Sequence, residues 1–168
     1  MIESDYLKDN NEIIQKLMRI PALKSFNEEN MQTLLHMSKI KEFKTGDLIF
    51  EEGSYANLIY YIIFGKARIV KDGKELIILQ RTGDVFGEMG PIDGSSRSAS
   101  VYAADDTVCV EIDISSLDKM SGDDMYSFRY MIFRGFAEIL ANRLRVTTDE
   151  LLHARNEIAE LRSLIKKD

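Results

Sequence analysis

The chain has 168 residues and a mass of 19.2 kDa, which is the length of one ordinary domain with a helical extension. Its composition, 45% hydrophobic and 30% charged, is typical of a folded protein, and its net charge of -6 argues against general affinity for nucleic acid or an anionic membrane. One cysteine excludes an internal disulfide framework, and two histidines far apart in sequence disfavour a metal or catalytic cluster. Because neither a long apolar run nor a leader-like start is present, we expect a cytoplasmic protein without a membrane partner.

Residues 1–40 are predicted to be N-terminal helices that belong to the same domain as the segment that follows. Pro21 separates two stretches in which apolar residues recur at helical spacing. Asn27 followed by Glu28 and Glu29 is typical of a helix start. The apolar positions are Ile13, Ile14, Leu17, Met18, Met31, Leu34 and Leu35.

Residues 41–122 are predicted to form an antiparallel β-roll. All glycines but one lie between Gly46 and Gly122, and many short strands with glycine turns imply an antiparallel barrel or sandwich. Asp72-Gly73 is a strong hairpin signal, and Cys109 is expected to be a small packed residue of a strand. The predicted strands are 47–50, 58–64, 67–71, 76–79 and 108–112.

Residues 123–168 are predicted to form C-terminal helices that include a dimerisation helix. Their apolar residues alternate in steps of four and three, a heptad seam of more than four heptads. Because one small domain cannot cover so long a seam, we expect a parallel coiled-coil homodimer; a single helix packed on its own roll is the alternative. In that dimer Glu150 would face Arg155 of the partner subunit. The seam residues are Phe133, Ala137, Leu140, Leu144, Thr147, Leu151, Ala154, Ile158, Leu161 and Ile165.

Residues 84–101 contain the most informative pattern, Phe86-Gly87-Glu88 followed by an arginine, a small residue and an alanine at 97–99. This segment resembles the phosphate-binding cassette of the cyclic nucleotide-binding domain family, and residues 46–53 and 60–65 resemble that family's strands. The resemblance covers about residues 20–114 and puts the cassette at 86–99. It implies an α+β fold in which the β-roll is a jelly-roll-like double-stranded β-helix between the N-terminal helices and a long C-terminal dimerisation helix.

The chemistry of a cyclic nucleotide fits these residue types. Gly87 permits close backbone approach and an unusual turn, and free N–H groups after it can point at the phosphate. Arg97 offers a planar fork of donors to the phosphate oxygens. The resemblance implies that Glu88 accepts from the ribose 2′-hydroxyl and orients Arg97, whereas the alternative is a surface ion pair around an ordinary loop. The predicted ligand residues of the cassette are Phe86, Gly87, Glu88, Met89, Arg97, Ser98 and Ala99.

The cassette departs from the family pattern at Gly90-Pro91, where apolar residues such as Leu or Ala are usual. Those positions help to couple the cassette to the following helix. Pro91 is compatible with a first helical turn, where its missing N–H costs little.

Residues 141–148 resemble the central helix of the catabolite-activator branch of the family. The resemblance implies that Thr147 reaches the adenine of its own subunit and that Thr148 leans toward the site of the partner subunit. Adenine's exocyclic amine is a donor, and a hydroxyl can accept from it. The alternative is that Thr147 only sets the register of a coiled coil.

The leading hypothesis is a regulatory sensor domain that binds cyclic AMP, requires no metal and dimerises through its last helix. Cyclic GMP is the alternative ligand, because a hydroxyl such as that of Ser98 can serve the guanine amino group in related domains. A second alternative is the sensor fragment of a catabolite-activator-type transcription regulator; we expect no DNA binding by this chain alone. An enzyme of cupin type is disfavoured, because it needs a histidine–carboxylate metal site.

Overall fold

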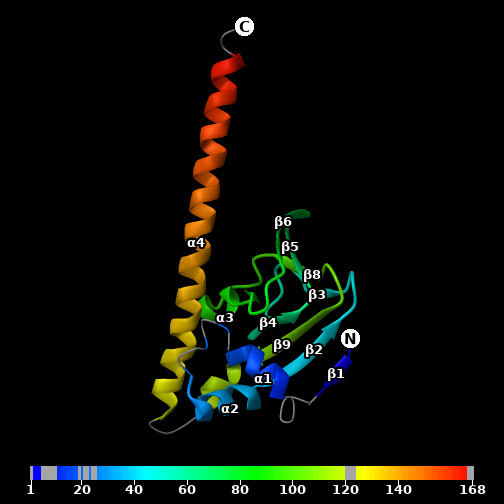
Figure 1. The fold of residues 1–168 in the computed structure, drawn as a ribbon, viewed down its shortest axis with the longest axis vertical. Helices are drawn as coiled ribbons and strands as arrows, with labels where there is room; N and C mark the ends of the chain where they lie inside the picture. The colour runs from blue at the N-terminus through cyan, green and yellow to red at the C-terminus, as the bar shows by residue number, and fades with distance from the viewer. Residues whose placement is uncertain are drawn as a thin grey trace.

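The computed structural model describes residues 2–4, 11–18, 20, 23, 26–119 and 124–165. Nine strands form two antiparallel sheets in this part of the chain, with short helices at one end and one long helix along the side (Figure 1). The strands are β1 (Ile2–Ser4), β2 (Ser38–Phe43), β3 (Leu48–Phe50), β4 (Leu58–Phe64), β5 (Ala67–Lys71), β6 (Lys74–Leu79), β7 (Val85–Phe86), β8 (Ser100–Ala103) and β9 (Thr107–Asp113). The helices are α1 (Asn11–Met18), α2 (Glu28–His36), α3 (Met89–Asp93) and α4 (Asp124–Ile165), with a 3-10 segment at Ile114–Lys119.

The strand order is β1-β2-β9-β4-β7 in one sheet and β3-β8-β5-β6 in the other. This arrangement confirms the predicted α+β fold with an antiparallel β-roll. Strands β4 and β5 match their predicted bounds, and β3, β6 and β9 differ from theirs by one or two residues at an end. The side chain of Asn27 caps α2 by accepting from the N–H of Asn30 at 2.8 Å, so the predicted helix start is also confirmed.

The expected helical region up to residue 40 extends too far. Helix α2 ends at His36, and β2 begins at Ser38 and pairs with β9, Ile40 opposite Val110. Two lysines and a glutamate in β2 obscure its strand pattern, and the pairing with β9 some seventy residues later decides its structure. Strands β7 and β8, which are two and four residues long, were also not predicted.

The core has two parts that lie on opposite faces of the five-stranded sheet. Alternate residues of β4 point to each face: Tyr61 joins the cluster under α1, α2 and α4, and Tyr60 joins the cluster between the sheets. Cys109 lies in the second cluster, where burial raises the pKa of its thiol to about 12. Its predicted role as a small packed residue is therefore confirmed.

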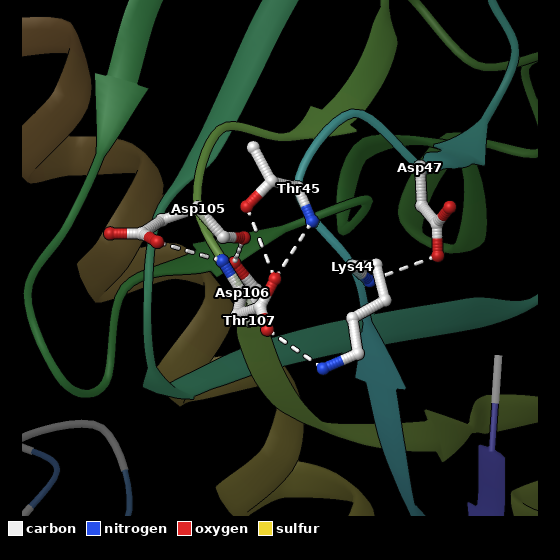
Figure 2. Close-up of polar contacts among 6 residues, drawn as sticks. All are labelled: Lys44, Thr45, Asp47, Asp105, Asp106 and Thr107. Carbon is white, nitrogen blue, oxygen red and sulfur yellow. Dashed lines mark hydrogen bonds and ion pairs between the residues drawn. The ribbon is translucent and has the colours of Figure 1, made fainter.

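A polar clamp joins the turn before β3 to the turn before β9 (Figure 2). The carboxylate of Asp106 accepts from the backbone N–H of Thr45 at 3.0 Å, from the Thr45 hydroxyl at 3.1 Å and from Lys44 Nζ at 2.7 Å. The backbone N–H of Lys44 donates to Asp47 at 2.9 Å. The bonds from Lys44 and Thr45 lower the pKa of Asp106 to about 2. The clamp fixes the two sheets to each other at this end of the roll.

Helix α4 is a single helix of 42 residues. Its first part packs on the core through Phe128, Ile132 and Phe136. From Leu144 onward every described side chain is exposed, and Figure 1 shows this half extending beyond the β-roll. No helix in the described ranges is long and apolar enough to cross a membrane.

Candidate functional site

The backbone of the cassette turns sharply at Gly87, directly after β7. Gly87 has a φ of +82°, and a Cβ built on it would lie 2.7 Å from Arg97 Nη1 and 3.2 Å from the carbonyl oxygen of Leu58. Helix α3 follows and ends at Asp93, and the N–H of the capping residue Gly94 donates to the Gly90 carbonyl at 2.8 Å. Only glycine at position 87 allows this close approach of the arginine to the turn.

The second half of the cassette lies against the loop that connects β3 and β4. The N–H of Gly53 donates to the carbonyl of Arg97, and the N–H of Arg97 donates to the carbonyl of Ser54, both at 2.8 Å. The N–H of Glu52 donates to Ser100 Oγ at 2.9 Å. These bonds hold the backbone of Arg97 and bring its side chain back to Gly87, ten residues earlier in the sequence.

The guanidinium of Arg97 is buried, with only 3% of the residue exposed. Nη1 donates to the Gly87 carbonyl at 2.5 Å and Nη2 to the Leu58 carbonyl at 2.7 Å. Among the described residues, no acceptor lies within hydrogen-bond distance of its buried Nε. Burial lowers the pKa of Arg97, and the charges of Tyr60 and Glu88 oppose this shift. A buried cation with an unused donor is suited to an anionic ligand.

Glu88 is buried, with 1% of the residue exposed, and its carboxylate is bound by the guanidinium of Arg143 from α4. Arg143 also donates to the carbonyl of Val85. Sequence reasoning expected Glu88 to orient Arg97 and did not identify Arg143 as its partner. The available signal was that Arg143 lies one helical turn before Thr147, and therefore on a similar side of the helix.

The other cassette residues predicted from sequence lie close to this centre. Phe86 is buried and stacks on Tyr60, with ring centroids 5.1 Å apart. Ala99 is buried, whereas Met89 and Ser98 are exposed and are joined by a hydrogen bond of 3.6 Å from the Ser98 hydroxyl to the Met89 sulfur. The contacts from Arg97 to Gly87 and from Ser98 to Met89 therefore bring the two halves of the predicted cassette, residues 86–89 and 97–99, together.

The two predicted purine contacts, Thr147 and Thr148, lie on α4. Both are exposed, and the Thr148 hydroxyl donates to the Leu144 carbonyl of its own helix at 2.7 Å. Within the described residues, no hydrogen bond links Thr147 or Thr148 to the cassette. Arg143 is the residue by which α4 contacts the cassette carboxylate.

Pro91 is the third residue of α3, as its missing N–H permits. It lines a cavity of about 110 Å³ together with Ile114, Leu117 and Phe133, where α3 meets the beginning of α4. Gly90 is buried, and a Cβ there would lie 2.9 Å from the carbonyl oxygen of Ser95. The Gly90-Pro91 departure is thus accommodated within α3, and Pro91 borders the cavity beside α4.

The sequence model of the cyclic nucleotide-binding domain matches residues 40–124, which include the whole cassette. The chain belongs to the cyclic nucleotide-binding domain family. It is therefore a cyclic nucleotide-binding regulatory domain, and the family resemblance seen in its sequence is confirmed.

Known relatives of this cyclic nucleotide-binding domain are longer proteins. It is 30% identical over 120 residues to a cGMP-dependent protein kinase of Toxoplasma gondii. The aligned region covers 71% of this chain and 12% of the kinase. It is 31% identical over 114 residues to a CRP-like cAMP-activated global transcriptional regulator of Mycobacterium tuberculosis. This aligned region covers 66% of this chain and 49% of the regulator. The chain thus spans less than half the length of these curated relatives.

A solved structure shows the same fold. The crystal structure of a cyclic nucleotide-binding domain from Methylobacillus flagellatus KT superposes with a TM-score of 0.75 at 21% identity, covering 83% of both chains. At this identity the similarity establishes the fold of the cyclic nucleotide-binding domain.

Proposed function

We propose that this domain is a cytoplasmic, non-catalytic sensor that binds cyclic AMP in the cassette of residues 86–99. The buried Nε of Arg97 carries the proposal. A buried cation is costly unless a counter-charge and hydrogen bonds compensate it. The hydrogen-bond acceptors of Arg97 are the backbone carbonyls of Gly87 and Leu58, and the carboxylate of Glu88 is bound by Arg143. A singly charged phosphodiester would supply both an anion and an acceptor for Nε.

The remaining cassette residues have roles that follow from their positions. Glu88 would accept from the ribose 2′-hydroxyl while Arg143 holds its carboxylate. Ser98 is exposed beside Arg97 and would donate to a phosphate oxygen, and Ala99 leaves space for the phosphate. Gly87 would let the backbone approach the phosphate closely, and Phe86 and Met89 would line the ligand site. No metal takes part in this scheme.

We further propose that two copies pair in parallel through α4 and that Thr147 and Thr148 contact the purine there. The exposed half of α4 supports the pairing, because the seam residues from Leu144 to Ile165 have no cover in the single chain. A second copy with the same seam would bury them, with Glu150 opposite Arg155 of the partner subunit. A purine beside this seam would meet hydroxyl groups.

Cyclic GMP is the second candidate ligand. The exposed hydroxyl of Ser98 supports it, since that group would be available to the guanine amino group. The relatives include both a cGMP-dependent kinase and a cAMP-activated regulator, so they favour neither nucleotide. Because the latter relative is a transcriptional regulator, a transcription regulator with this domain as its sensor is the second candidate for the whole protein.

Calorimetry with cyclic AMP, cyclic GMP and 5′-AMP tests the proposal. We expect cyclic AMP to bind most tightly and Arg97→Ala to weaken it at least tenfold, because loss of a buried charged partner costs about 2–5 kcal/mol. Arg68→Ala, on β5 outside the cassette, is the matched control and should bind normally. If cyclic GMP binds more tightly than cyclic AMP, cyclic GMP replaces cyclic AMP as the proposed ligand. Unchanged affinity in Arg97→Ala would exclude the assigned site.

A further inference from the structure

The Arg97 guanidinium lies over the ring of Phe50, with the guanidinium carbon 4.2 Å from the ring centroid. We propose that Phe50 is a positioning residue of the ligand site: its ring face holds the guanidinium in the orientation from which Nε meets an anion. The inference rests on the proposed function and adds a residue that no cassette motif contains.

Three contacts together define the orientation of the guanidinium. The carbonyl oxygens of Gly87 and Leu58 accept from its two terminal nitrogens and fix the direction of the fork within its plane. Hydrogen bonds in the plane do not prevent the fork from tilting about the line between those two nitrogens. The ring of Phe50 lies under one face and opposes that tilt. The remaining edge, which carries Nε, is the one without an acceptor among the described residues.

The ring of Phe50 is itself fixed by an aromatic cluster. Its centroid lies 5.8 Å from that of Tyr60 and 5.9 Å from that of Phe86, and the latter two rings are stacked. The β3–β8 pairing shifts register between Leu48 and Phe50, an irregularity of the kind that redirects a strand's side chains. Phe50, at the end of β3, therefore contacts Phe86 of the cassette. Because its ring is held in place, it also holds the guanidinium of Arg97 in place.

The electrostatics explain why an aromatic ring suits this place better than a carboxylate. A ring face attracts a cation through its quadrupole, and the attraction is strongest where water is excluded, as at Arg97. The ring has no net charge, so it stabilises the guanidinium without neutralising it. A carboxylate at that position would compete with the ligand anion. The nearby carboxylate, Glu88, is bound by Arg143 instead.

Stepwise fluorination of Phe50 tests the inference, because fluorine weakens the negative ring face while preserving the shape of the side chain. We would incorporate mono-, di- and trifluorophenylalanine at position 50 of the full chain and measure cyclic AMP affinity by calorimetry. Affinity should fall with each fluorine, to about tenfold below wild type for the trifluoro ring. Phe50→Tyr should retain wild-type affinity, and Phe50→Leu should lose at least as much as the trifluoro variant.

The same series at Phe43 is the matched control. Phe43 packs in the same cluster, 6.4 Å from Tyr60, and no described cation lies over its ring. Fluorination there should leave affinity unchanged, and the melting temperature of every variant shows that it is folded. Cyclic AMP binding that is insensitive to fluorine at Phe50 would overturn this inference alone. Wild-type protein that binds no cyclic nucleotide would overturn the proposed function, and the positioning role with it.

Discussion

Arg143 of α4 binds the buried carboxylate of Glu88, 55 residues earlier in the chain. The contact joins the cassette directly to the helix that carries the exposed seam. Because Arg143 also donates to the Val85 carbonyl, it contacts the chain on both sides of Phe86-Gly87. A ribose hydroxyl on Glu88 would share that carboxylate with Arg143, so ligand and helix would meet at one group.

Arg143→Met should destabilise the protein by about 1–3 kcal/mol, because it leaves a buried carboxylate without its partner. Denaturant unfolding measures the change. The double variant Glu88→Gln/Arg143→Met should lose less than the two single variants combined, since the unpaired charge is gone. Arg145→Met is the control, because no ion pair or side-chain hydrogen bond of Arg145 occurs among the described residues. An equal loss in that control would contradict a specific role for Arg143.

Gly87→Ala should weaken nucleotide binding much more than Gly94→Ala. Both glycines have positive φ, +82° and +73°, so both substitutions carry a backbone cost of about 1–2 kcal/mol. Only at Gly87 would the new methyl group lie 2.7 Å from Arg97 Nη1, whereas nothing lies within 4 Å of it at Gly94. Calorimetry of both variants decides, and equal affinities would show that the turn acts only through its backbone.

Leu151→Lys should convert the proposed dimer to a monomer, whereas Leu152→Lys should not. The two leucines are neighbours with similar exposure, 49% and 53%, but only Leu151 lies at a seam position. Sedimentation equilibrium over a range of concentrations measures the association constant of each variant. Wild-type protein that stays monomeric throughout, or equal behaviour of the two variants, would remove the coiled-coil assignment.

Asp106→Asn should lower stability at neutral pH but not at about pH 1, below both pKa values of Asp106. The folded pKa of Asp106 is about 2, below the unfolded value of about 3.9, so its carboxylate stabilises the fold above both values. The contribution is lost as pH falls from about 4 through 2, and wild type and variant should converge at about pH 1, below both pKa values. Thermal melts at several pH values, with Asp149→Asn as a control for the lost charge, test this window. A gap that persists undiminished at about pH 1 would assign the effect to packing.

Local signals made part of this structure predictable from sequence. The Asp72-Gly73 turn gave the β5–β6 hairpin, because such a dipeptide favours the required backbone conformation. The order of Phe86, Gly87 and Arg97 identified the cassette, because its residues are close together in sequence and have special chemistry. The apolar residues from Phe133 to Ile165 recur in steps of four and three without a break, and this spacing predicted a long helix.

Contacts between distant segments could not be predicted in this way. Phe50 looks like any apolar strand residue until the fold places Arg97 over its ring. Arg143 looks like a solvated charge until α4 passes Glu88. Strand β2 owes its structure to β9, and its own lysines conceal it. In each case the decisive partner lies tens of residues away, so no local pattern contains the information.

The unsupported half of α4 has a mechanical consequence. From Arg143 to Ile165 the helix rises by about 33 Å, at 1.5 Å per residue. If Arg143 acts as the pivot, a tilt of about 5° there would move the far end by about 3 Å, which lies between the helix shifts of about 1–2 Å and the one-turn shifts of about 5.4 Å seen in allosteric proteins. A displacement too small to disturb the cassette would thus be magnified at the tip, and the helix would serve as a lever arm.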